Sequence, residues 1–156
     1  MANLNGFSKK QILEIYYKMS LSRALDKKML ILLKQGKSFF HMGASGHEAA
    51  QLAASLIIKP GKDWSYPYYR DGAYCLGLGM TSREQLLSFL SKADDPNSGG
   101  RQMPMHYGHK DLRIVSQSSP TGSQFLQALG SSFAAQYDKS RDIVYVSSGE
   151  GTTSQG

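Results

Sequence analysis

Asp142-Ile143-Val144-Tyr145-Val146-Ser147, followed by Ser148-Gly149-Glu150-Gly151, is the stretch of sequence that decides the fold class. Its β-branched run predicts a strand that is buried on both faces, as strands of parallel sheets are. The Gly-Glu-Gly turn comes directly after this strand, at its carboxyl end. Ligands bind at that edge of parallel α/β sheets. We therefore expect an α/β fold, with a parallel sheet flanked by helices.

Helices are predicted on both sides of the irregular middle of the chain. Ser8 and Gln11 have the spacing of a capping box, and apolar residues then recur at helical intervals as far as Gly36, a plausible stop. We expect further helices over 46–58, ended by Pro60-Gly61, over 82–90, and over 121–137, the last buried against the sheet. The segment 64–72 is aromatic and turn-rich, and 94–105 is expected to be a loop.

The predicted organisation is one domain, with residues 1–60 as a helical lead-in and 61–156 as the start of the core. A chain of 156 residues with 40% hydrophobic content can bury a core of its own. The net charge of +6 comes from basic residues spread along the chain, which favours a solvated surface. Without a base-stacking or groove-binding motif, nucleic acid is not an expected partner.

The compartment is predicted from cysteine usage and from the lack of targeting segments. Cys75 is the only cysteine, so no intrachain disulfide is expected. The amino-terminal stretch Met-Ala-Asn-Leu-Asn-Gly-Phe-Ser lacks the features of a secretory signal, and no apolar run reaches membrane-spanning length. The sequence therefore predicts a soluble, cytoplasmic protein without a membrane partner.

Two motifs carry groups that suit a phosphorylated ligand. Glycines at 149 and 151 let the backbone approach a phosphate, and Glu150 between them can hold a bridging Mg²⁺. An ordinary strand-to-helix turn would look the same locally. Tyr69-Arg70 places a phenol beside a guanidinium that can fork two hydrogen bonds to phosphate, although a surface salt bridge of Arg70 with Asp71 is the simpler reading.

Two further segments are candidates for proton transfer and for cation binding. The loop Gly100–His109 contains His106 and His109, which can exchange protons near neutral pH, although a lone histidine is more often a structural hydrogen-bonding residue. The segment Ser118–Gln124 gathers hydroxyls, an amide and carbonyls around a proline turn before a helix. These oxygens suit either the cap of that helix or a hard monovalent cation.

Taken in order, five motifs resemble the α subunits of thiamine-diphosphate-dependent 2-oxoacid dehydrogenases. The Gly-Arg-Gln-Met-Pro loop with His-Tyr-Gly points to the branched-chain group, and pyruvate and acetoin dehydrogenases are close alternatives. The resemblance implies a thiamine-diphosphate-binding fold and covers nearly the whole chain. The motifs are Gly46-His47-Glu48-Ala49-Ala50, Tyr68-Tyr69-Arg70-Asp71, Gly100-Arg101-Gln102-Met103-Pro104, Ser118-Ser119-Pro120 and Gly149-Glu150-Gly151.

The resemblance also implies roles for single residues. Tyr69 and Arg70 would hold the cofactor diphosphate and Glu150 would bind Mg²⁺, while His106 would be the active-site histidine. The residues that would surround the rest of the ligands are Gly149, Gly151 and Thr152 at the phosphates, Ser119 and Thr121 at the aminopyrimidine ring, Ser118, Pro120, Ser123 and Gln124 at a structural K⁺, and Phe40 at the substrate side chain.

The implied activity is decarboxylation of a 2-oxoacid and transfer of the acyl group to a lipoyl group on an acyltransferase partner. A β subunit or β domain would complete the site and supply the activating glutamate. Gln155 departs from the glutamate that is more common in the family, and the sequence ends at Gly156, before an asparagine that binds Mg²⁺ in the family. The fold is thus expected to be incomplete here and the chain alone inactive. A non-catalytic module that docks a β partner is the alternative from another class.

Overall fold

A computed structural model of the chain describes residues 6–116 and 118–155. Gly156 and the first five residues of the amino-terminal stretch considered above lie outside the described residues. The elements, in chain order, are α1 (Lys9–Lys34), α2 (Glu48–Ser55), β1 (Trp64–Tyr66), α3 (Gly72–Leu78), α4 (Ser82–Phe89), α5 (Ser123–Tyr137), β2 (Val144–Val146) and the 3₁₀ helix η1 (Glu150–Ser154).

The sheet consists of β1 and β2, which pair in parallel with Trp64 opposite Val144. This confirms the α/β class and the parallel sheet. The prediction that the second strand is buried on both faces is wrong, because all three residues of β2 are only partly buried. In the described part of the chain, β2 pairs with one strand, contacts α5, and stacks Tyr145 on Tyr74 of α3, and this cover leaves part of each β2 residue accessible.

The long first helix begins and ends where the sequence predicts. The Ser8 hydroxyl accepts a hydrogen bond from the Gln11 backbone N–H, and the Gln11 side chain accepts one from the Ser8 backbone N–H, so both arms of the capping box form. The helix ends just before Gly36, whose φ of +69° continues the chain in a left-handed conformation. A second capping box, made by Thr81 and Glu84, starts α4. The predicted helix over 46–58 forms only as α2, between Glu48 and Ser55.

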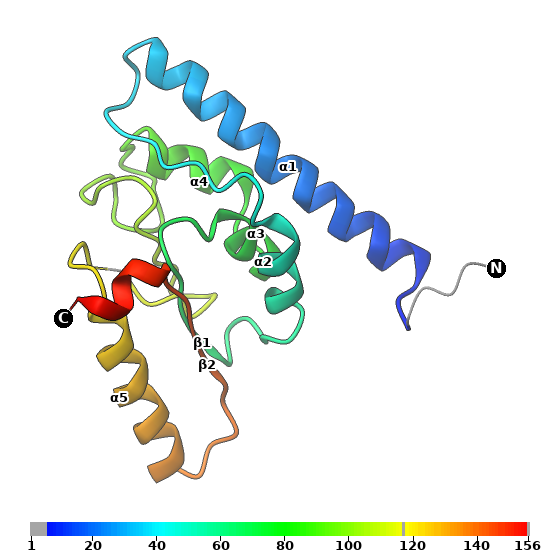
Figure 1. Cartoon of the computed structure of the whole chain (residues 1–156), viewed down its shortest axis with the longest axis vertical. Helices are drawn as coiled ribbons and strands as arrows, with labels where there is room; N and C mark the ends of the chain where they lie inside the picture. The colour runs from blue at the N-terminus through cyan, green and yellow to red at the C-terminus, as the bar shows by residue number, and fades with distance from the viewer. Residues whose placement is uncertain (1–5, 117, 156) are drawn as a thin grey trace.

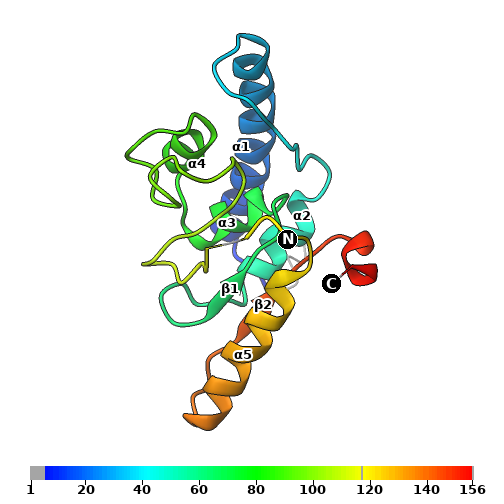
Figure 2. The same ribbon diagram turned by 90° about the vertical axis from the view of Figure 1, so that its left-hand side faces the viewer.

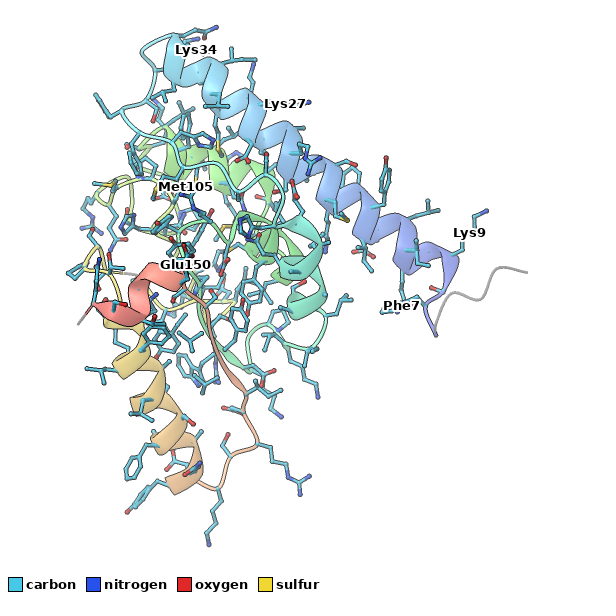
Figure 3. The ribbon with its side chains drawn as sticks, viewed as in Figure 1. Phe7, Lys9, Lys27, Lys34, Met105 and Glu150 are labelled. Atoms are coloured by element: carbon cyan, nitrogen blue, oxygen red, sulfur yellow. The ribbon has the colours of Figure 1, made fainter. Side chains whose placement is uncertain are left out.

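The core lies between α1 and the sheet, and α3 is its centre. Figures 1 and 2 show α2, α3 and α4 gathered beneath α1, with the two strands on their other side and α5 at the opposite end of the molecule. Tyr74 and Cys75 of α3 are fully buried, as is Phe89 at the end of α4. Polar side chains such as Lys9, Lys27 and Lys34 extend outward along α1 (Figure 3).

Helix α5 forms over nearly the predicted residues, but the prediction that it is buried is wrong. Leu126, Leu129 and Phe133 are 72%, 64% and 70% exposed. One narrow face meets the strands, through the buried Ala128 and a 2.5 Å hydrogen bond between the hydroxyls of Ser131 and Tyr66. Helical periodicity shows that a helix has an apolar face, but it does not show which other residues cover that face.

None of the helices in residues 6–116 and 118–155 is both long enough and apolar enough to cross a membrane.

Candidate functional site

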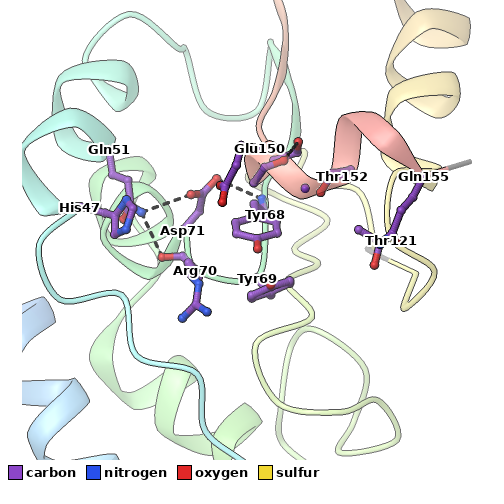
Figure 4. A pocket seen from close by; sticks show the side chains of 13 residues that line it. His47, Gln51, Tyr68, Tyr69, Arg70, Asp71, Thr121, Glu150, Thr152 and Gln155 are labelled. Atoms are coloured by element: carbon purple, nitrogen blue, oxygen red, sulfur yellow. Dashed lines mark hydrogen bonds between the residues drawn. The ribbon is translucent and has the colours of Figure 1, made fainter.

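A cleft of about 560 Å³ lies at the carboxyl ends of the two strands. Because β1 and β2 are parallel, the segments that follow them leave the sheet at the same edge and form two facing walls. Figure 4 shows these walls, with α2 contributing from one side. The lining residues are His47, Gln51, Tyr68, Tyr69, Arg70, Asp71, Thr121, Ser148, Gly149, Glu150, Gly151, Thr152 and Gln155.

The wall that follows β1 presents two phenols and a guanidinium. The rings of Tyr68 and Tyr69 lie 3.8 Å apart, and the Arg70 guanidinium lies 5.3 Å from the centre of the Tyr69 ring. Arg70 Nη1 donates a hydrogen bond of 2.8 Å to the Gly43 carbonyl, while its Nε and Nη2 have no partner among the described residues. Burial, with Tyr69 adding to it, raises the pKa of Tyr68 to about 12, so this phenol stays protonated.

Asp71 does not form the salt bridge with Arg70 that was the simpler reading of this motif. Its carboxylate instead accepts hydrogen bonds from the Ser147 hydroxyl, from the Tyr68 backbone N–H at 3.0 Å and from Gln51 Nε2 at 3.2 Å. Burial raises the pKa of Asp71, and the hydrogen bonds from Ser147 and Tyr68 oppose that shift. Asp71 therefore ties the ends of the two strands together and holds the walls of the cleft in place.

The wall that follows β2 is the Gly-Glu-Gly turn and the start of η1. A side chain at Gly149 would lie 2.9 Å from the Tyr68 hydroxyl, so only glycine lets the two walls approach this closely. A side chain at Gly151 would meet nothing within 4 Å, because its backbone borders open space. Glu150 is exposed and lines the cleft, whereas Thr152 is buried and its backbone N–H already donates to the Gly149 carbonyl at 3.1 Å.

The donors of this cleft fit a diphosphate that carries a divalent cation. Arg70 offers unused N–H groups on one wall, and Gly151 offers an unobstructed backbone on the other. Glu150 is the lining carboxylate that is not already bound by protein donors. Among the described residues, no group of three His, Cys, Asp or Glu side chains could hold a metal by itself. A cation at Glu150 would thus need phosphate oxygens or water as its other ligands.

His106 lies beside the cleft, behind the two phenols. It lines a small cavity together with Tyr68, Tyr69 and Ser119, and it is only 6% exposed. Its Nδ1 is 3.2 Å from the Pro104 carbonyl, which can only accept, so Nδ1 carries the proton. Nε2, at 3.1 Å from the Ser119 hydroxyl, then accepts from Ser119. The structure thus brings His106 and Ser119 together at the edge of the site.

The segment predicted to hold K⁺ or to cap a helix brings together three of the four residues that were expected around K⁺. The Ser123 hydroxyl bonds the Ser118 hydroxyl and donates to the Pro120 carbonyl at 2.9 Å. Gln124 turns away toward β2, where its Nε2 donates to the Ser147 carbonyl at 3.2 Å. Neither Ser123 nor the neighbouring Gly122 provides a side-chain cap for α5, which begins with Gly122 at φ +93°.

Phe40 is not among the lining residues of this cleft, and its predicted place at the substrate stays a prediction. His109 packs against α4, with Nε2 3.6 Å from Glu84 and Nδ1 accepting from the Leu112 backbone. The lining residues that received no site role from the sequence are His47, Gln51, Tyr68, Asp71, Ser148 and Gln155.

Known proteins resemble the chain along almost its whole length. The 2-oxoisovalerate dehydrogenase subunit alpha of Bacillus subtilis (strain 168) is 40% identical over 151 residues, which cover 97% of this chain and 46% of that protein. The mitochondrial 2-oxoisovalerate dehydrogenase subunits alpha of Caenorhabditis elegans and Homo sapiens are 32% and 30% identical, and the chain covers 35% and 33% of them. It thus spans about half the length of the bacterial relative.

A sequence model of one family matches the chain from residue 16 to residue 156, a range that contains both walls of the cleft. The two parallel strands lie within that match, together with the Tyr-Arg pair and the Gly-Glu-Gly turn that the sequence analysis singled out. On these grounds the chain belongs to the dehydrogenase E1 component family.

Proposed function

We propose that this chain forms one side of a thiamine diphosphate site in the decarboxylating component of a 2-oxoacid dehydrogenase complex. The observation that carries the proposal is the convergence of Arg70 and the Gly149–Thr152 turn on one cleft from two parallel strand ends. Branched-chain 2-oxoacids are the proposed substrate class, because the relatives are named 2-oxoisovalerate dehydrogenases. Pyruvate and acetoin are the alternative substrates.

The chain's own groups would bind and orient the cofactor. The free N–H groups of Arg70 would donate to the terminal phosphate, and Glu150 would bind the Mg²⁺ that neutralises the phosphate oxygens. Ser119 and Thr121 would lie beside the aminopyrimidine ring, and the Ser118–Gln124 segment would hold K⁺. Bound thiamine diphosphate supplies a thiazolium that serves as an electron sink when CO₂ leaves the oxoacid. His106, whose Nε2 is held by Ser119, would exchange a proton at that nitrogen.

The proposed partners are a β subunit or β domain and a lipoyl-bearing acyltransferase. The β partner would cover the open side of the cleft and supply the glutamate that activates the aminopyrimidine. The acyl group would pass to the lipoyl group of the acyltransferase. For this reason the 156-residue chain without β is expected to release no CO₂ from a 2-oxoacid.

Calorimetric titration of the α/β assembly with thiamine diphosphate and Mg²⁺ tests the proposal. Charge-assisted hydrogen bonds contribute about 1.5–3 kcal/mol, so Arg70→Ala should weaken binding roughly 10- to 100-fold. Arg70→Lys should recover only part of the loss, because an ammonium lacks the planar fork. Arg83→Ala is the matched control, since Arg83 is a largely exposed arginine of α4, 3.8 Å from Asp94 and outside the cleft.

Equal affinity in the parent and in Arg70→Ala would refute the assignment of Arg70. The alternative, a docking module without catalysis, predicts a different result. In that case the chain binds β with high affinity, yet the assembly takes up no thiamine diphosphate and forms no CO₂.

A further inference from the structure

Asp26 of α1 lies against the loop that precedes α2. Its Oδ2 accepts a hydrogen bond from the Ala44 backbone N–H and another from the Ser45 hydroxyl, both at 2.9 Å. The backbone of Gly43 comes so close that a Cβ built there would lie 3.4 Å from the same oxygen. One carboxylate oxygen thus fixes Ala44 and Ser45 to α1, with Gly43 held close beside it.

The other oxygen of Asp26 has no hydrogen-bonding partner among the described residues. It faces His41 Nε2 at 3.5 Å, and the His41 side chain is only 1% exposed. Neither ring nitrogen of His41 has a hydrogen-bonding partner in the described part of the chain. The hydrogen bonds of Asp26 within the described residues therefore go to Ala44 and Ser45, and its second oxygen faces only the His41 ring.

The same loop reaches the cleft at Arg70. The Gly43 carbonyl accepts the 2.8 Å hydrogen bond from Arg70 Nη1, which fixes one arm of the guanidinium and leaves the other donors free. At its other end, the Arg70 backbone carbonyl accepts from Gln51 Nε2 at 3.0 Å. The Gly43 carbonyl accepts the short hydrogen bond that orients the charged end of Arg70, and the phenols of Tyr68 and Tyr69 lie beside the guanidinium.

We propose that Asp26 is a positioning residue for Arg70: it anchors the loop 43–45, and the Gly43 carbonyl then aims the guanidinium into the cleft. The proposal rests on the proposed function, in which Arg70 binds the diphosphate. Asp26 itself does not line the cleft and touches no ligand there. Its contribution is to preorganise Arg70, so that less order has to be imposed when the ligand binds.

A double-mutant cycle on thiamine diphosphate affinity tests the coupling, with calorimetry of the α/β assembly in Mg²⁺. Asp26→Ala frees the loop but leaves the charge of Arg70 in place, so binding should weaken about 3- to 10-fold, less than in Arg70→Ala. In the Arg70→Ala background, Asp26→Ala should change the affinity by less than about 2-fold. A merely structural role of Asp26 would weaken binding equally in both backgrounds.

Two further variants sharpen the test. Asp26→Asn should bind almost like the parent, because the amide oxygen can accept from Ala44 and Ser45 while the amide nitrogen faces His41 Nε2. Glu14→Ala is the matched control on the same helix, since Glu14 pairs only with Lys18 at 3.3 Å among the described residues. Loss of affinity in Asp26→Asn equal to that in Asp26→Ala would overturn the proposal.

The same cycle on urea unfolding without ligand separates this proposal from the proposed function. If the parent assembly binds no thiamine diphosphate, the proposed function is wrong, and the unfolding cycle decides the positioning alone. If the losses in free energy of unfolding caused by Asp26→Ala and Arg70→Ala are not additive in the double variant, the connection through Gly43 is supported. Strictly additive losses overturn it. Hydrogen exchange should rise in residues 43–46 of Asp26→Ala, and unchanged exchange there would equally overturn the anchor.

Discussion

Replacing Gly77 by alanine should force apart the two helices that support the cleft. A Cβ at Gly77 in α3 would overlap the Ser55 hydroxyl of α2 and would lie 2.5 Å from Ser55 Cβ and 3.2 Å from Leu52 Cδ2. The hydroxyl could rotate only by giving up its 2.7 Å hydrogen bond to the Leu52 carbonyl, and the Ser55 Cβ is fixed by the backbone. The added methyl group therefore cannot be accommodated without a shift of α2.

The expected change in the free energy of unfolding of Gly77→Ala follows from two opposing effects. Overpacking of this kind costs about 1–3 kcal/mol, and exchanging glycine for alanine within a helix returns about 1 kcal/mol. The clash with backbone-fixed atoms puts the cost near the upper end, so we expect a net loss of about 1–2 kcal/mol in the free energy of unfolding. Because α2 carries Gln51, the shift should also weaken the hydrogen bonds of Gln51 to Arg70 and Asp71.

Urea unfolding followed by circular dichroism measures the loss of stability in Gly77→Ala, with Gly130→Ala as the control. Gly130 lies in α5, and a Cβ there meets nothing within 4 Å, so the same substitution should stabilise the chain by about 0.5–1 kcal/mol. Adding Ser55→Gly to Gly77→Ala removes both clashing atoms of Ser55 and should recover part of the loss. Gly77→Ala as stable as the parent, or Gly130→Ala as destabilised as Gly77→Ala, would refute this packing argument.

Two other outcomes are expected from the charges of the chain. In Glu150→Gln, thiamine diphosphate binding should require a higher Mg²⁺ concentration, because a hard cation loses an anionic ligand at an exposed position, and Glu150→Asp should lie in between. Superimposable Mg²⁺ titration curves would contradict this. Burial lowers the pKa of His41, and Asp26 opposes this shift, so His41 resists protonation in the folded protein. The free energy of unfolding should therefore decrease as the pH falls from about 6.5, the pKa of an unfolded histidine, through the lowered pKa of the folded state. Urea unfolding between about pH 7 and pH 5 should show a smaller loss of stability in His41→Leu than in the parent. An equal loss in the two proteins would count against a role of His41.

The sequence predicted those elements whose signals are local. The first helix has a capping box and a regular apolar stripe, and the structure confirms both its start and its end. Helix α3 was missed because Gly-Ala-Tyr-Cys-Leu-Gly-Leu has no periodic pattern and contains two weak helix formers. Its small residues serve the close approach to α2, a requirement that becomes visible only once the two helices are placed together.

Burial was the least predictable property. The apolar residues of β2 and α5 imply cover on all sides, but the residues of β2 are only partly buried although Tyr145 stacks on Tyr74, and α5 leaves most of its apolar side chains exposed within the described residues. Short β1 was missed as well, because Trp-Ser-Tyr is only three residues long and is followed by Pro67. An apolar sequence pattern shows that a segment can pack against other apolar residues. Which residues pack against it depends on the three-dimensional fold.

The two walls of the candidate site were predicted because each carries its own chemistry, although only the Gly-Glu-Gly turn was expected to follow a strand. The parallel pairing then explains why Tyr69-Arg70 and Gly149-Glu150-Gly151 meet. Asp71 could not be recognised in the same way, since its partners Gln51 and Ser147 are 20 and 76 residues away along the chain. Nothing in the local sequence distinguishes such a buried link from a surface aspartate.

A 2.9 Å hydrogen bond from the Tyr68 backbone N–H to the Ser147 hydroxyl closes a loop whose two ends are 79 positions apart along the chain. Helices α3, α4 and α5 all lie inside this loop, and the entropy needed to close it delays its formation during folding. A ligand that binds both walls acts as a non-covalent crosslink between the two ends of this loop, and by mass action it stabilises the folded state in which the ends are together. Occupancy of the cleft should therefore slow hydrogen exchange in helices that the ligand never touches.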